Sequence, residues 1–221
     1  SGNINGKLGV FPSDHFQNNN ARIGCPAESL LSLTVGSIAK FENASSLSNT
    51  NMISPFSRIG PGSDLGVKPE IVAHGGNMIT PYTKSPRVST YGISKDGMNL
   101  SVDIGTSFSA PLIAQYAQRL FDLYPSSDPN LIKGLLCHFS EKRDLHDEIN
   151  EPCINYTGFG EPNLDHAIQA QGNNAVYIYE GELNQTDYQI VTFNVPDSLA
   201  SDTDSKLKIR ITITYDPSVN P

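Results

Sequence analysis

The segment around Gly105 constrains the fold most, because the hydrophobic period changes there from that of a strand to that of a helix. Residues 99–104 alternate as a strand does, and together with 89–91 and the turn-rich 94–97 they predict a hairpin. From Ser107 the apolar residues recur at helical spacing for several turns. The sequence therefore predicts a strand, a glycine turn and a buried helix in immediate succession.

Segments on either side of this junction extend the pattern. Apolar runs at 30–39 and 70–73 are typical of strands covered on both faces. Asp128 and Pro129 offer a cap and an early proline for a second helix, from 131 to about 140. Strands that alternate with helices favour a three-layer α/β fold around a mainly parallel sheet.

The two ends of the chain differ from this central part. Residues 1–26 are rich in Gly and Asn, have no period and predict a long loop. After about residue 172, three β-rich segments with alternating side chains follow, at 176–179, 188–195 and 207–215. We expect a partial α/β domain over 1–172 and a truncated antiparallel β extension over 173–221, which is a candidate oligomerisation surface.

The charge balance excludes some classes of partner. Fifteen Lys and Arg oppose 23 Asp and Glu, for a formal net charge of -8, so we expect no nucleic-acid partner. No apolar run approaches the roughly 20 residues of a membrane span, so we expect no membrane partner. An odd number of cysteines favours free thiols and leans towards a cytoplasmic location, although the localisation stays open.

Four residues raise the question of a zinc site: Cys137, His138, His146 and Cys153. Adjacent ligands on a helix diverge, and the CxxC pairs of structural zinc sites are missing. A buried Cys137 with exposed histidines is therefore favoured, and we expect no metal ligands.

Ser107 is the candidate nucleophile. A serine attacks a carbonyl if a base removes its proton and donors stabilise the resulting oxyanion. Gly105 permits close backbone approach, and the helix from Ser107 directs unpaired N–H groups at developing negative charge. A serine that merely caps the helix explains the spacing about equally well. The GxSxG hydrolase elbow is disfavoured, because Ser109 replaces its second glycine.

Ordered motifs favour the nucleophile. Residues 105–111, GTSFSAP, resemble the Gly-Thr-Ser-x-Ala-x-Pro signature of the subtilisin-like serine peptidases, with Ser109 in place of alanine. Further segments resemble that family in the same order: the Gly-Asn oxyanion segment at 1–3, the strand at 25–39, the stretch at 54–76 and the segment at 156–168. The resemblance covers residues 1 to about 172 and implies part of a subtilisin-like parallel sheet.

By this resemblance the protein is a serine endopeptidase that cleaves polypeptide substrates through an acyl-enzyme at Ser107. The Asn3 side-chain amide and the Ser107 N–H are implied as oxyanion donors, and Gly2, Gly105 and Thr106 as substrate-binding residues. The family's catalytic Asp and His are expected upstream, so this chain alone is expected to be inactive. The chemistry requires no cofactor. Family members often bind calcium, but no contiguous DxDxDG loop occurs here.

The histidines of this chain are poor substitutes for the missing base. His74 stands at a strand end where the family has proline, and a loop role is favoured. Asp165 and His166 are neighbours on a predicted helix and point about 100° apart. Asp14 and His15 lie in the predicted loop, where a solvated role is the default.

Two other functions stay open. A sedolisin-like serine-carboxyl peptidase has a similar Gly-Thr-Ser motif, but it uses a Glu base and an Asp oxyanion residue, which Asn3 disfavours. A pseudoprotease or binding module would keep the scaffold without turnover. The sequence upstream of Ser1 would decide among the three.

Overall fold

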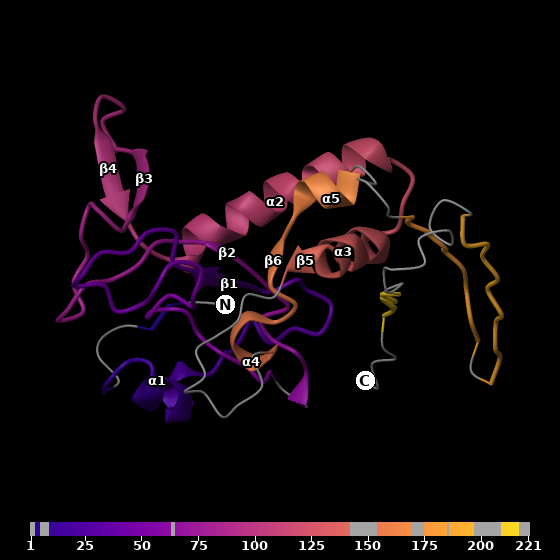
Figure 1. Cartoon of the computed structure of the whole chain (residues 1–221), viewed down its shortest axis with the longest axis horizontal. Helices are drawn as coiled ribbons and strands as arrows, with labels where there is room; N and C mark the ends of the chain where they lie inside the picture. Colours follow the sequence, from indigo (N-terminus) through magenta and orange to yellow (C-terminus); the bar gives the residue numbers. More distant parts are fainter. Residues whose placement is uncertain are drawn as a thin grey trace, which may run out of the picture.

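A computed structural model describes residues 3–4, 9–62, 65–141, 154–168, 175–184, 186–196 and 209–216 of the chain. Helices and short strands alternate along it (Figure 1). In chain order the elements are α1 (Ser13–Gln17), the 3-10 helix η1 (Asn19–Ala21), β1 (Val35–Ile38), β2 (Ile71–His74), β3 (Thr90–Ile93), β4 (Leu100–Asp103), α2 (Thr106–Leu123), α3 (Pro129–His138), β5 (Ser140–Glu141), α4 (Ile154–Thr157), β6 (Glu161–Pro162) and α5 (Leu164–Ile168).

A small parallel sheet lies at the centre of the fold. β1 and β2 pair in parallel, with Val35 opposite Ile71 and Ile38 opposite His74. The sheet agrees with the predicted α/β class, but β1 is shorter than the predicted strand over 30–39. The first residues of that run form a bend and are exposed, because the ladder with β2 begins only at Val35.

The predicted succession of hairpin, glycine turn and helix is confirmed. β3 and β4 pair antiparallel and form a hairpin that stands away from the rest of the molecule in Figure 1. α2 follows directly after Gly105. The second predicted helix is α3, and the Asp128 side chain caps it by accepting a hydrogen bond from the N–H of Asn130 at 2.8 Å.

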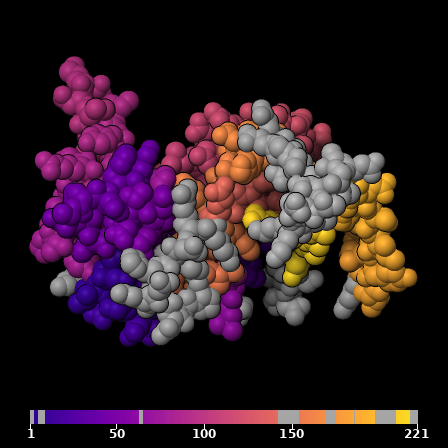
Figure 2. Space-filling model, viewed as in Figure 1, coloured from indigo at the N-terminus to yellow at the C-terminus, as the bar shows by residue number. Residues whose placement is uncertain are grey.

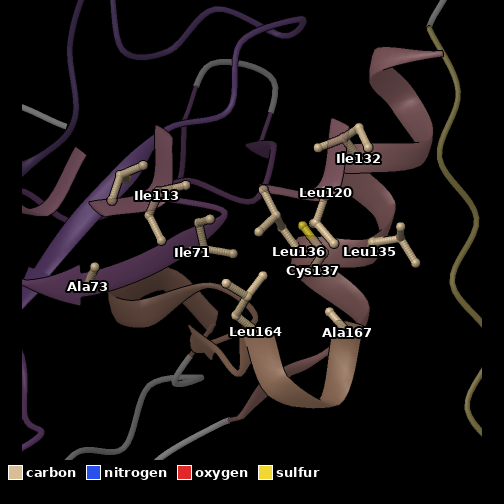
Figure 3. Packing of buried hydrophobic residues seen from close by; sticks show 11 residues of the cluster. Ile71, Ala73, Ile113, Leu120, Ile132, Leu135, Leu136, Cys137, Leu164 and Ala167 are labelled. Carbon is tan, nitrogen blue, oxygen red and sulfur yellow. The ribbon is translucent and has the colours of Figure 1, made fainter. Parts of the chain in front are cut away.

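Most of the core lies between the parallel sheet and helices α2, α3 and α5 (Figure 3). Ile113 and Leu120 of α2 are 3% and 0% exposed, and Ile71 of β2 packs in the same cluster. Leu136 of α3 and Leu164 of α5 close it on the other side. Burying the sheet on this face accounts for the apolar character of both strands.

The prediction of one long loop over 1–26 is wrong. α1 and η1 form within this stretch, and Asn18 caps η1 by accepting a hydrogen bond from the N–H of Asn20 at 2.9 Å. Phe16 anchors α1, because its ring stacks on Tyr156 with centroids 4.1 Å apart. The two rings belong to a second buried cluster. Tertiary packing therefore orders a segment that carries no local period.

The predicted antiparallel β extension is not formed in the described residues 175–184, 186–196 and 209–216, where no strand is assigned. Strands need a neighbouring backbone and a buried face. Here the apolar side chains from Val176 to Val195 are 39% to 85% exposed. The predicted boundary near residue 172 lies outside the described residues.

The helices show no sign of a membrane segment. α2 is the longest in the described part of the chain, and neither it nor any other helix there combines the length and apolar character of a span.

Candidate active site

The nucleophile candidate lies at the junction between β4 and α2. Ser107 is the second residue of α2 and is exposed to solvent. Neither its hydroxyl nor its N–H has a hydrogen-bond partner among the residues that the structure describes. The N–H groups of a first helical turn carry partial positive charge, so a negatively charged atom beside Ser107 would be stabilised there.

Gly105 makes this junction possible. The glycine is buried, has a φ of 154°, and donates its N–H to the Gly75 carbonyl at 2.9 Å. A Cβ on Gly105 would lie 3.0 Å from Nδ2 of Asn3. A side chain at this position would therefore displace the amide that the sequence predicts as an oxyanion donor.

Asn3 meets this junction from 103 positions away in the sequence. Its Oδ1 accepts hydrogen bonds from the Thr106 N–H at 3.0 Å and from the Thr106 hydroxyl at 3.2 Å. Two donors require an oxygen, so Nδ2 must occupy the other amide position. Nδ2 has no acceptor within the described ranges. The amide is thus anchored at one end and able to donate at the other.

Thr106 and Gly2 were predicted to bind substrate. Thr106 is 6% exposed, and its side chain hydrogen-bonds Asn3. That contact gives Thr106 a role in positioning the amide. Gly2 lies outside the described residues, and its predicted role stays a prediction.

Three polar residues behind the site, Ser57, His15 and Ser109, were not predicted from the sequence to support it. Asn3 and Ser57 form an antiparallel bridge, and His15 lies beneath it with Nε2 3.1 Å from the Ser57 carbonyl oxygen. Ser109 of α2 donates to the Ala73 carbonyl of β2 at 2.9 Å. The sequence does carry a signal for His15, because Phe11 and Phe16 flank it, and both rings contact the imidazole.

The predicted solvated role of His15 is wrong. The side chain is 3% exposed, and burial lowers its pKa to about 4, although the hydrogen bond with Ser57 opposes that shift. His15 is therefore neutral at physiological pH and supports the Asn3 segment as an uncharged group.

No described histidine bonds Ser107. His74 ends β2 and lies 3.2 Å from a carboxylate oxygen of Glu161 in β6. His166 lies 3.7 Å from Glu141, and His138 hydrogen-bonds Thr212. The structure therefore ties these three side chains to partners other than the nucleophile.

Metal ligands do not gather in the described part of the chain. Cys137 is buried, and desolvation raises its pKa to about 12, which keeps the thiol protonated. No group of three or more His, Cys, Asp or Glu fit for a metal ion occurs in the described ranges. Cys153 and His146 lie outside them. The possible calcium site stays a prediction.

Known proteins similar to this chain include peptidases. The family model described as the subtilase family, Peptidase S8, matches residues 1–179. An uncharacterized protein of Sinorhizobium fredii, y4bN, is 26% identical over 231 residues, which cover 93% of this chain and 53% of that protein. The chain thus spans about half the length of this curated relative.

Two solved structures are also similar to the chain. The CspB protease of Clostridium perfringens is 25% identical with a TM-score of 0.45, over 66% of this chain and 28% of that one. The epidermin leader peptide processing serine protease of Staphylococcus aureus is 22% identical with a TM-score of 0.49, over 69% of this chain and 34% of that one.

Proposed function

The chain belongs to the subtilase family, and from that premise we propose that it serves as part of a serine endopeptidase with Ser107 as nucleophile. The observation that carries the proposal is the anchored Asn3 amide beside an exposed serine at a helix N-terminus. A helix-capping serine would need no such amide, whereas an oxyanion needs fixed donors in place before it forms.

In the proposed reaction, Ser107 Oγ attacks the carbonyl carbon of a polypeptide and loses its proton to a histidine base. The carbonyl oxygen becomes an oxyanion, which accepts hydrogen bonds from Asn3 Nδ2 and the Ser107 N–H. The C–N bond then breaks, the amine leaves with the proton, and water later hydrolyses the ester at Ser107. No described histidine bonds Ser107, so we propose that His and Asp from elsewhere in the protein complete the triad.

Active-site labelling tests the nucleophile in the full-length protein. A fluorophosphonate probe should label the wild type, and Ser107→Ala should abolish labelling because the attacking oxygen is gone. Ser109→Ala is the matched control: Ser109 lies in the same turn but is 0% exposed, so labelling should persist. Unchanged labelling of the Ser107→Ala variant would refute the assignment. A wild type that never reacts would favour the pseudoprotease.

An Asn3 variant separates this proposal from the sedolisin alternative. Asn3→Asp replaces the amide donor with an acceptor, so kcat should fall roughly 100- to 1000-fold with little change in KM. That range was measured for a subtilisin, a member of this same family. A sedolisin-like enzyme uses Asp as its oxyanion residue, so full activity in the Asn3→Asp variant would favour that class.

The positioning role of Thr106 predicts a smaller effect. Thr106→Val removes the hydroxyl that donates to Asn3 Oδ1 but keeps the side-chain volume and the N–H bond. We expect kcat to fall about tenfold, since one of two anchoring hydrogen bonds is lost. Thr106→Ser, which keeps a hydroxyl, should restore most of the rate. Equal losses in both variants would contradict a role through the hydroxyl.

A further inference from the structure

Residues 209–216 form an extended segment with two unlike faces, which lies along α3 (yellow in Figure 1). Three even-numbered side chains, those of Arg210, Thr212 and Thr214, contact the helix. Arg210 Nη1 donates to the His138 carbonyl at 2.5 Å, Thr212 Oγ1 lies 2.8 Å from His138 Nδ1, and Thr214 Oγ1 donates to the Asn130 carbonyl at 2.9 Å. The segment therefore turns its polar face towards the protein.

The odd-numbered face is apolar and points away from α3. Ile209, Ile211, Ile213 and Tyr215 are 61%, 76%, 79% and 74% exposed. The backbone of 209–216 also has no hydrogen bond to the backbone of any other described residue. β-branched side chains in strict alternation, with unpaired N–H and C=O groups, form an edge that favours pairing with another strand.

We propose that this segment pairs antiparallel with the same segment of a second copy of the chain, centred on Ile213. In that register Arg210 stands opposite Asp216 of the second copy, and Ile211 stands opposite Tyr215. The two-fold axis repeats each pair, so two ion pairs and a continuous apolar stripe form at once. The register is self-complementary in charge because the arginine and the aspartate are equally distant from Ile213.

The nearby segments of the same chain fit this edge less well. Residues 176–179 and 188–195 are also extended and exposed, and side chains of Tyr177 and Phe193 hold them together, with ring centroids 5.3 Å apart. The charged residues beside these segments, Glu180, Glu182 and Asp187, are all acidic, so the described residues 175–184 and 186–196 offer no Lys or Arg to face Asp216. A second copy supplies a cation for Asp216 and an anion for Arg210, and charge complementarity therefore favours it over the segments 176–179 and 188–195.

A charge-swap experiment on the full chain tests both the partner and the register. Sedimentation velocity over a range of concentrations should show a monomer–dimer equilibrium for the wild type. Arg210→Asp and Asp216→Arg should each raise the dimer dissociation constant about tenfold or more, since like charges then face each other twice. An equimolar mixture of the two variants should recover the dimer, because every facing pair is then of opposite charge.

Matched apolar substitutions identify the surface without depending on the ion pairs. Ile213→Lys places two ammonium groups at the two-fold axis and should abolish the dimer. Ile190→Lys is the control, because Ile190 is also 79% exposed but lies in the segment 188–195. A monomeric wild type at all concentrations, a mixture of charge variants that stays monomeric, or a dimer lost with Ile190→Lys but not Ile213→Lys would each overturn the proposal. The readout is association, so the outcome is independent of peptidase activity.

Discussion

The β1–β2 sheet and the segment 209–216 both contain β-branched residues in an extended chain, yet only one of them is a sheet. β1 pairs with β2 over four residues and has a burial pattern in which every residue is buried. The isoleucines of 209–216 are more than 60% exposed and lack a backbone partner among the described residues. β propensity thus favours a local extended conformation, whereas a neighbouring strand and a covering helix decide whether a sheet forms.

Truncating a leucine should have unlike effects in the core that covers the β1–β2 sheet and in the exposed C-terminal segments. Leu120→Ala removes a side chain that is 0% exposed from the core and should lower the free energy of unfolding by roughly 2 to 5 kcal/mol. Leu183→Ala makes the same chemical change where the side chain is 62% exposed and should stay within about 0.5 kcal/mol. Urea unfolding measures both. Equal losses would show that residues 175–196 are as well packed as the core.

Acid should destabilise the folded protein through the buried His15. The pKa of His15 is about 4 when folded and 6.5 when unfolded, so between these values the unfolded state binds the extra proton. The free energy of unfolding should therefore fall as the pH drops from 6.5 to 4, by up to about 3 kcal/mol. His15→Gln should flatten this dependence, whereas His166→Gln, at an exposed site, should leave it in place. Parallel curves for wild type and His15→Gln would contradict the assignment.

One side-chain hydrogen bond links α2 to β2, from Ser109 to the Ala73 carbonyl. Ser109→Ala removes the bond to the Ala73 carbonyl at a site that is 0% exposed, and it should cost about 1 kcal/mol of stability. Thermal unfolding measures the change. If Ser109→Ala were more stable than the wild type, burial of the hydroxyl would cost more free energy than its hydrogen bond to Ala73 contributes.

The smallest effect is expected where the segments 176–179 and 188–195 contact each other. Phe193→Ala removes the ring contact with Tyr177, but both side chains are about half exposed. We expect a change below about 0.5 kcal/mol in the same thermal measurement. A loss of more than about 1 kcal/mol of stability would indicate that Tyr177 and Phe193 are covered by a part of the protein outside the described residues.

Local patterns predicted the local parts of the molecule well. The hairpin, Gly105 and α2 are specified by neighbours in the sequence, and so is the Asp128 cap of α3. The neighbouring Phe11 and Phe16 signal an apolar setting for His15, but its burial also depends on Ser57, 42 positions away, which no local pattern specifies. The ladders missing from the described residues 175–184, 186–196 and 209–216 have the same origin, since alternation specifies an extended chain but not its neighbour. Figure 2 shows the described residues 175–184 and 186–196 at one end of the molecule.

The family resemblance predicted roles for Asn3 and Ser107, but the hydrogen bonds of Thr106 to Asn3 became visible only in the structure. A residue that positions another side chain through hydrogen bonds has no sequence motif of its own. Gly75 is a comparable case: its carbonyl receives the Gly105 N–H, and a Cβ there would lie 2.4 Å from Ser37 Oγ.

The contact between Asn3 and Thr106 joins positions that are 103 residues apart, which gives it a consequence for the order of folding. α2 can form from local interactions, whereas docking of Asn3 must offset the entropy of closing a loop of that length. A folding intermediate with α2 in place but Asn3 undocked would lack the hydrogen bonds between Asn3 and Thr106. If Asn3 and Ser107 act as proposed, such an intermediate could not stabilise an oxyanion until tertiary assembly is complete.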